Sequence, residues 1–514
     1  MKPIRLMAGF FTVGVWTMAS RILGFVRDIL IVGYLGSGPV AQAFFVAFSL
    51  PNMFRRFFAE GAFNMAFVPM FSKKLEGDDD PHGFARDAFS GLATVLILFS
   101  IIAIFAMPWL VVAMASGFLG DERFDLAVVF GRIAFPYILF ISLAALLSGL
   151  LNATGRFAAA AAAPVLLNVL FVVAVFLGVQ LGWPLGLTLA WTVPVAGLAQ
   201  MALVWVAAAR IGFSLWPSRP KLTPDLKRLA IIAAPAALAG GVLQINLLVG
   251  RQVASFFDGA IVWLYTADRL YQLPLGVVGI AIGIVLLPDL SRRLRAGDTT
   301  GGRDAFNRAA EISLALTVPA AVALCVIPVP LIHVLFQRGA FDGTDTLATA
   351  AAVAVYGLGL PAFVLQKVLQ PLYFAREDTA SPFRFALVAM VVNAVLAVGL
   401  IYVAGFLAAA IGATVAAWAM VVLLWLGSRS MGEAAAIDER LKHRTGRIML
   451  AATFMGLSLY TASLWLAPLL YSAAWRYPAL IILIALGIFV YFFAAHHLGA
   501  LRLPEIRRTL RRQR

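Results

Sequence analysis

Apolar segments of roughly 20 residues, the length needed to cross about 30 Å of hydrocarbon, recur along almost the whole chain. No stretch between them is long enough for a soluble domain of ordinary size. Backbone polar groups in lipid must pair within their own segment, so such segments fold as helices. The runs are also too long and continuous to be strands of a membrane barrel. The sequence therefore predicts an all-α polytopic membrane protein.

The composition supports this class, because 62% of the residues are hydrophobic, whereas soluble domains are roughly 45–50% apolar. The first segment is expected to be retained, since it exceeds signal-peptide length and contains arginines. We predict about 14 transmembrane helices. Their expected limits are 7–35, 40–72, 86–115, 124–151, 160–180, 185–209, 228–256, 260–290, 306–336, 346–374, 382–404, 407–428, 447–470 and 477–499.

The distribution of cations predicts the orientation. If the N-terminus is cytoplasmic, the outer loops hold only Arg123, Arg338 and Arg476, as the positive-inside rule requires. Both termini are therefore expected in the cytoplasm. The net charge of +15 is spread over many loops and not gathered on one face, which argues against a nucleic-acid partner.

Some cations lie within the predicted spans, where no loop accounts for them: Arg21, Arg27, Arg55, Arg56, Arg132, Arg251, Arg269 and Lys367. The acids at comparable depth are Asp28, Glu60 and Asp268. A lipid-facing cation costs about 2.5–3.5 kcal/mol on an insertion scale, so these side chains must line a hydrated cavity, form ion pairs or reach a span end. A span-end role is preferred for Arg132. Three acids cannot neutralise the whole set, so a cationic cavity with an anionic cargo is expected.

The chain repeats itself weakly after about 220 residues. A Leu-Pro pair at 50–51 and another at 273–274 are each followed by Pro-x-x-Ser-basic-basic-Leu. Asn168 and Asn393 occupy corresponding positions further on. We therefore predict a six-helix lobe over 1–215, a second six-helix lobe over 216–430, and two C-terminal helices with a basic cytoplasmic tail over 431–514. The first half contains an extra turn, and the segment RRFFAEG falls within it.

Spacing suggests pairs within two of the charged spans. In SRILGFVRD, Arg21 and Asp28 are seven residues apart and share a helical face, while Arg27 is about 100° away. Arg21 and Asp28 are thus the expected pair, which leaves Arg27 the freer cation, and Gly24 between them permits close helix approach or a bend. In the eighth span, Asp268 lies beside Arg269.

Other function classes find little support. The chain has no P-loop, so it is not expected to hydrolyse ATP, and its histidines lack metal-ligand spacing. A membrane glycosyltransferase stays an alternative, with its acids drawn from the outer loops. Those acids are Asp121, Glu122, Asp258, Asp342 and Asp345.

Three long segments resemble a known family. SRILGFVRD, AFFVAFSLPNMFRRFFAEGAFNMAFVP and YTADRLYQLPLGVVGIAIGIVLLPDLSR are similar to signature segments of the MurJ (MviN) lipid II flippases, within the multidrug/oligosaccharidyl-lipid/polysaccharide exporter superfamily. The resemblance implies two six-helix lobes and two further helices that shape a groove for a lipid tail. It also implies transfer of undecaprenyl-pyrophosphate-linked peptidoglycan precursor from the inner to the outer leaflet of the bacterial inner membrane.

The matched motifs also imply roles for particular residues. Substrate binding is expected of Arg21, Arg27, Arg55, Arg56, Arg251, Arg269 and Lys367, and a structural or gating role of Gly24, Asp28, Glu60, Asp268, Gln42 and Gln272. Within the first set, Arg27, Arg55 and Arg269 are expected to hold the pyrophosphate, and the role of Arg56 stays open. Gln42 and Gln272 stand where family members often have acids, which puts carboxylate-based gating in doubt.

The expected partners are lipid II and the phospholipid bilayer, for a monomer that is not an enzyme. No cofactor or metal is expected, and the energy source is left open between a coupling ion (Na⁺ or H⁺) and the membrane potential. Transient contacts with cell-wall synthesis proteins stay an option. The alternatives are a flippase for another polyprenyl-linked glycan, a membrane glycosyltransferase and a cell-wall scaffold. A cationic-drug antiporter is disfavoured by the excess of cations.

Overall fold

The structure is a computed structural model that describes the backbone of residues 3–55, 62–77, 79–219 and 221–500. Within these ranges every regular element is a helix, apart from one isolated bridge between Arg338 and Phe341. The predicted all-α class is confirmed. The chain divides into two compact units, Met1–Val262 and Trp263–Arg514. This division follows packing whereas the predicted lobes follow the sequence repeat, so the lobe boundaries stay a prediction.

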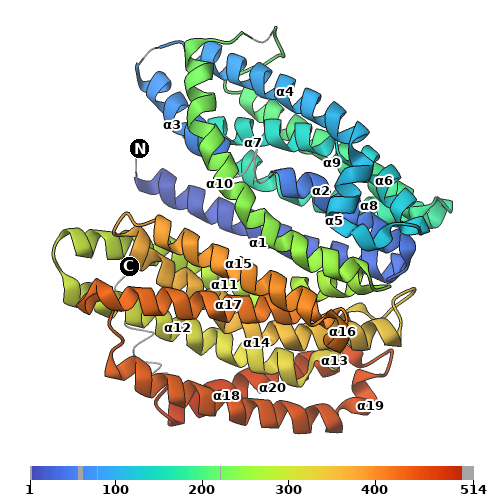
Figure 1. The fold of residues 1–514 in the computed structure, drawn as a ribbon, viewed down its shortest axis with the longest axis vertical. Coiled ribbons are helices and arrows are strands. Elements are labelled where there is room, and N and C mark those ends of the chain that lie inside the picture. The colour runs from blue at the N-terminus through green and yellow to red at the C-terminus, as the bar shows by residue number, and fades with distance from the viewer. Residues whose placement is uncertain (1–2, 56–61, 78, 220, 501–514) are drawn as a thin grey trace. The chain divides into compact units, whose positions relative to one another are not determined.

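The first unit contains the helices coloured from blue to green in Figure 1. Helix α8 packs against α1 and α9, while α2 packs against α6. Rings of Phe44, Phe48 and Phe171 pack together where α2 meets α8, with centroids 5.7 Å apart for Phe48 and Phe171. The bounds are α1 Pro3–Leu35, α2 Pro39–Arg55, α3 Ala62–Gly77, α4 Pro81–Phe105, α5 Met107–Ala115, η2 Ser116–Phe118, α6 Glu122–Ala134, α7 Tyr137–Ala153, α8 Ala158–Leu181, α9 Leu185–Ala209 and α10 Pro224–Ser255.

The second unit is built around α14, which packs against α12 and α17. Its core includes Leu290, Leu372, Tyr373 and Leu424, and α12 also contacts α18, which pairs with α20. The bounds are α11 Ala260–Arg295, α12 Thr299–Val326, α13 Pro328–Phe336, α14 Gly343–Phe374, α15 Ala380–Gly399, α16 Ile401–Ala404, α17 Leu407–Ser428, η3 Arg429–Met431, η4 Glu433–Ala435, α18 Glu439–Trp465, α19 Ala467–Leu470 and α20 Arg476–His497.

Prolines divide several of the predicted spans. Helix α4 ends at Phe105 and α5 begins at Met107, with Pro108 in its first turn. In the same way α12 ends at Val326, and Pro328 starts α13. Proline has no N–H to donate and fits best at a helix start, so it ends one helix and begins the next. The spans predicted over 86–115 and 306–336 thus each contain two helices, and Pro136 and Pro468 lie where those over 124–151 and 447–470 divide.

Polar side chains cap the N-termini of several helices. Asp342 accepts a hydrogen bond from the Asp345 N–H, and Asp345 accepts one from the Asp342 N–H, which forms a capping box at the start of α14. Asp345 also accepts a hydrogen bond from the Trp263 indole at 2.7 Å. Further side-chain caps come from Asp80, Asp121, Thr223, Asp298 and Asp438. These side chains satisfy amide groups that a helix start leaves unpaired.

Helix α10 is joined to the first unit at both of its ends. Lys74 of α3 pairs with Asp225 at 2.9 Å near the start of α10. At the other end, Gln252 accepts hydrogen bonds from the backbone and hydroxyl of Ser116, and Ser255 accepts one from the Gly117 N–H. A Cβ on Gly117 would lie 2.6 Å from the Ser255 backbone, so this contact requires glycine.

Ten helical segments within the described residues are long and apolar enough to cross a membrane. They are Pro81–Phe105, Glu122–Ala153, Ala158–Leu181, Leu185–Ala209, Thr299–Val326, Gly343–Phe374, Ala380–Gly399, Leu407–Met431, Glu433–Trp465 and Arg476–His497. The protein is therefore a multi-pass membrane protein. The other predicted spans fall on α1, α2 with α3, α10 and α11, which carry the charged motifs, and the total of about 14 stays a prediction.

Candidate functional site

Arg27 of α1 lies in a buried polar site between α1 and α8. Its Nε and Nη2 atoms donate to Asp28 Oδ1 at 3.0 and 2.7 Å, and its Nη1 donates to Asn168 Oδ1 at 3.0 Å. Only 7% of Arg27 and 3% of Asp28 is exposed. The guanidinium carbon also lies 5.8 and 5.5 Å from the ring centroids of Phe48 and Phe171, within range of cation–π attraction.

Asn168 joins α8 to α1 as well as orienting Arg27. Its amide nitrogen donates to the Ser20 carbonyl at 2.9 Å. The same side chain lies against Gly24, where a Cβ would be 3.5 Å from Asn168 Nδ2, an ordinary van der Waals distance. The two helices thus approach closely at Gly24, as expected, although an alanine would still fit there.

The expected pairing of Arg21 with Asp28 is wrong. Asp28 is engaged by the adjacent Arg27, and Arg21 is partly buried without an ion pair to any described residue. Helical spacing separates neighbouring residues by about 100°, but the long arginine side chain can turn along the helix. The asparagine of α8 and the two rings hold the guanidinium in that position, and these contacts could not be read from α1 alone.

The second-span charges are only partly described. Arg55 is partly buried at the end of α2, whereas Arg56 and Glu60 lie outside the described residues. Arg251 is partly buried on α10 and so belongs to the first unit. Arg132 is exposed and donates to the Ile104 carbonyl, and its span-end role stays a prediction.

The second unit contains a separate group of charged residues on α11. Arg269 donates to the Tyr265 hydroxyl at 2.7 Å, and its guanidinium lies 4.6 Å from the centroid of that ring. Gln272 donates to the Asp268 carboxylate one turn earlier. A carboxylate at 272 would instead repel Asp268, so the neutral amide suits this position. Lys367 is exposed on α14.

Gln42 is buried in the first unit, where its hydrogen-bond partner differs from those in the Arg27 site. Its side-chain oxygen accepts a hydrogen bond from Arg123 at 3.3 Å. Arg123 also pairs with Asp121 at 2.5 Å and with Asp258 at 3.1 Å, and it stacks on the Phe118 ring. The hydrogen bond from Arg123 holds the pKa of Asp121 below its ordinary value. Two acids already balance Arg123, so a neutral residue is sufficient at position 42.

Two buried polar residues, one in each unit, have contacts that the sequence does not predict. Asn168 was noted only as a mark of the repeat, although a lone amide in an apolar span signals a buried hydrogen bond. Glu311 was not singled out at all, yet it is only 3% exposed. Among the described residues, no three His, Cys, Asp or Glu side chains lie close enough to hold a metal ion.

Comparison with known proteins identifies the family of this chain. Residues 31–486 match the family described as lipid II flippase MurJ. A protein of Rhizobium tropici named probable lipid II flippase MurJ is 43% identical over 520 residues, which cover 99% of this chain and 97% of that protein.

Two solved structures share the fold. A lipid II flippase MurJ in an inward closed conformation has a TM-score of 0.79 at 24% identity, and the match covers 94% of this chain and 98% of that one. An inward-facing multidrug resistance MATE family transporter of the MOP superfamily has a TM-score of 0.65 at 14% identity, covering 83% and 98%. The sequence matches extend over nearly the full length, and the chain therefore belongs to the lipid II flippase MurJ family.

Proposed function

We propose that this protein moves lipid II from the inner to the outer leaflet of the bacterial inner membrane. The observation that carries the proposal is the family membership over nearly the whole chain, joined to a guanidinium buried inside a helix bundle. A buried charge in a membrane protein is expensive and marks a functional site by default. The cargo has one strongly anionic group, its pyrophosphate, which guanidinium groups bind well.

In this proposal Arg27 is oriented before the cargo arrives. Asp28 occupies Nε and Nη2, while Nη1 donates to the neutral amide of Asn168. A charge-assisted hydrogen bond to phosphate is stronger than one to an amide, so a phosphate oxygen can replace Asn168 at Nη1 without breaking the pair with Asp28. Pyrophosphate binding is also proposed for Arg55 and Arg269, and Arg21, Arg56, Arg251 and Lys367 are proposed as further cations that bind the cargo.

Alternating access would bring this site to either side of the membrane. Such transport requires that the inward and outward states bind the head group unequally, with Na⁺, H⁺ or the membrane potential supplying the bias. The proposal includes about 14 spans in two six-helix lobes. The two halves of the chain support this proposal, because they share an order of elements. Asp80 caps α4 and Asp298 caps α12, and a short helix with proline in its first turn follows each of these helices.

The prenyl tail is expected to follow α18 and α20, the last two spans, while the head group occupies the hydrated cavity. These helices expose large apolar side chains, including Leu457, Ile481 and Phe489, which are 60%, 67% and 67% exposed. The protein would act as a monomer in the bilayer, with both termini in the cytoplasm.

The deciding experiment measures transfer of labelled lipid II between leaflets of proteoliposomes that contain only this protein. Arg27→Ala combined with Arg55→Ala should slow transfer about 100-fold or more, because each charge-assisted hydrogen bond contributes roughly 1.5–3 kcal/mol. Arg132→Ala, an exposed cation of the same unit, is the matched control and should transfer at nearly the normal rate. No transfer by the unsubstituted protein, or full transfer by the double variant, would contradict the proposal.

The glycosyltransferase alternative loses most of its candidate acids. Asp121 caps α6 and pairs with Arg123, and Asp342 and Asp345 form the capping box of α14. Asp258 also pairs with Arg123, which leaves Glu122 as the remaining candidate for a general base among the five acids. A flippase for another polyprenyl-linked glycan would use the same cations, so competition of unlabelled lipid II with other polyprenyl-linked glycans in the leaflet assay distinguishes that alternative.

A further inference from the structure

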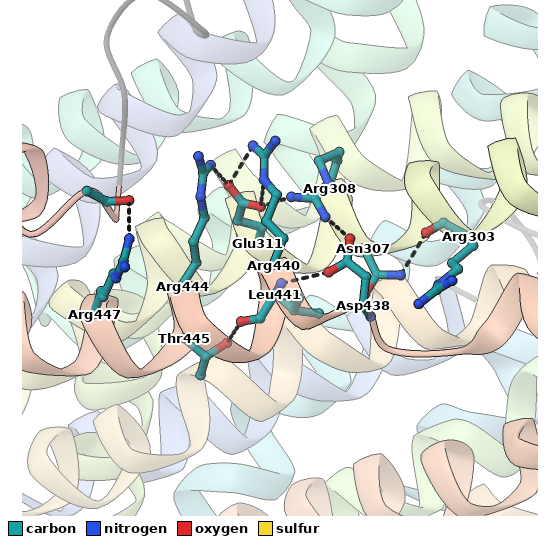
Figure 2. A network of polar contacts seen from close by, with 11 residues as sticks. Arg303, Asn307, Arg308, Glu311, Asp438, Arg440, Leu441, Arg444, Thr445 and Arg447 are labelled. Atoms are coloured by element: carbon teal, nitrogen blue, oxygen red, sulfur yellow. Dashed lines mark hydrogen bonds and ion pairs between the residues drawn. The ribbon is translucent and has the colours of Figure 1, made fainter.

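A buried carboxylate on α12 collects three arginines, as Figure 2 shows. Glu311 accepts hydrogen bonds from Arg308 on its own helix and from Arg440 and Arg444 on α18. The contact from Arg440 Nε measures 3.2 Å. Glu311 and Arg444 are 3% and 8% exposed, so this carboxylate is surrounded by protein and guanidinium groups.

One turn earlier, Asn307 of α12 binds the backbone that leads into α18. Its side-chain oxygen accepts a hydrogen bond from the Asp438 N–H at 3.0 Å, and its nitrogen donates to the Ala436 carbonyl at 2.8 Å. Asn307 is fully buried. Arg308 also pairs with the Asp438 side chain. Three neighbouring residues of α12 therefore hold a single segment, residues 436–444.

This segment determines where α18 begins. Asp438 is the N-cap of α18 and accepts a hydrogen bond from the Leu441 N–H at 2.6 Å, in addition to its pair with Arg308. Helix α20, which packs on α18, is tied to α12 by the Tyr491 hydroxyl, which donates to the Ala315 carbonyl at 2.6 Å. One face of α12 thus sets the position of both helices of the last pair.

Ion pairs at this degree of burial are a poor way to gain stability, because desolvation of the charges offsets much of their attraction. Apolar packing would hold two helices together with less cost, as it does where Gly456 of α18 lies against Val322 of α12. What a buried polar network adds is a defined register, since only one arrangement satisfies all its groups.

We propose that Glu311 is a positioning residue that sets α18 and α20 in the register that receives the prenyl tail of the cargo. The inference rests on the proposed function, because it assumes a lipid-linked cargo whose tail follows these two helices. Glu311 acts through the arginines and does not itself touch the cargo. Substitution of Glu311 should therefore slow transfer of a cargo with a long tail and have little effect on transfer of a cargo with a short tail.

The test compares two cargoes with the same pyrophosphate and sugar-peptide head, one with the undecaprenyl chain and one with a farnesyl chain. Leaflet transfer of both is measured in proteoliposomes containing the full-length protein. Glu311→Gln should slow the undecaprenyl cargo about tenfold and the farnesyl cargo less than about twofold. Arg440→Gln should change either rate less than about twofold, because that side chain is 44% exposed and water can replace its contact.

A second control separates positioning from loss of stability. Tyr373→Phe removes a buried hydrogen bond between α14 and the Leu424 carbonyl of α17 in the core of the same unit, and it leaves the polar contacts of α18 and α20 in place. It should lower the Tm without changing the ratio of the two transfer rates. Equal slowing of both cargoes by Glu311→Gln, or the same change of ratio in Tyr373→Phe, would overturn the inference while leaving the proposed function intact. Absence of transfer of both cargoes by the unsubstituted protein would overturn both.

Discussion

The Arg27 site of the first unit and the Glu311 network of the second use the same chemical groups in opposite proportions. At the first, one arginine is shared between a carboxylate and an amide, beside two aromatic rings. At the second, one carboxylate is shared among three arginines. At the first site, the central arginine can exchange its hydrogen bond to the Asn168 amide for one to an anionic ligand. Where the acid is central, its loss removes the shared carboxylate from three guanidinium groups at once, which suits a fixed joint.

The largest effect is expected at the central acid. Glu311→Gln leaves Arg444 buried without its carboxylate, and removing one member of a buried pair costs about 3–5 kcal/mol. Arg440→Gln should cost less than about 1 kcal/mol, because the side chain is partly exposed. Thermal unfolding of the purified variants in detergent measures both. Equal losses would remove the distinction between the central acid and its peripheral partner.

The next effect concerns the central cation. Arg27→Lys keeps the charge but cannot donate to Asp28 and Asn168 with one rigid fork, so lipid II transfer should fall roughly 10–100-fold. Arg440→Lys is the matched change in the Glu311 network, and its transfer rate should stay within about twofold. A normal rate for Arg27→Lys would mean that charge alone, without orientation, is sufficient at this site.

A smaller effect is expected from the neutral partner. Asn168→Ala removes the hydrogen bond to Arg27 Nη1 and the one to the Ser20 carbonyl, which together should cost about 1–3 kcal/mol of stability. Because phosphate can take the place of the amide at Nη1, cargo should restore part of the lost Tm. Added lipid II should thus raise the Tm of Asn168→Ala more than that of the unsubstituted protein. An equal increase would argue against an exchange at Nη1.

The smallest effect belongs to an ion pair whose acid is exposed. Arg123 lowers the pKa of Asp121 from its ordinary value of 3.8, so this pair stabilises the fold above that pH and is lost as pH falls through the lower folded value. Asp121→Asn should cost less than about 1 kcal/mol at pH 7, since the Asp121 side chain is 38% exposed. The Tm difference from the unsubstituted protein should stay constant from about pH 5 to 8 and vanish in strong acid. A Tm difference that changes between about pH 5 and 8 would mean that a group other than Asp121 titrates.

Local chemistry was readable from the sequence. The apolar runs predicted helices, because lipid leaves the backbone no other way to pair its polar groups. The caps at Asp121 and Asp342 follow the ordinary preference for acids before a helix. The divisions at Pro108 and Pro328 were also readable, since proline favours a helix start, but the apolar run hid them.

Partners from distant segments could not be predicted in the same way. Arg27 meets Asn168 across 141 positions, and Glu311 meets Arg444 across 133. One sequence contains many polar residues at such separations, and periodicity does not choose between them. For the same reason, no local sequence pattern predicts the ion pair between Lys74 and Asp225 that joins α10 to α3.

The Glu311 network also bears on the order in which the protein is made. Glu311 leaves the ribosome 129 residues before Arg440, so α12 must enter the membrane before its partners on α18 exist. During that interval Arg308, three residues earlier on the same helical face, is the cation at hand to reduce the cost of the carboxylate. Docking of α18 and α20 then closes the network and becomes the final step in assembly of the second unit.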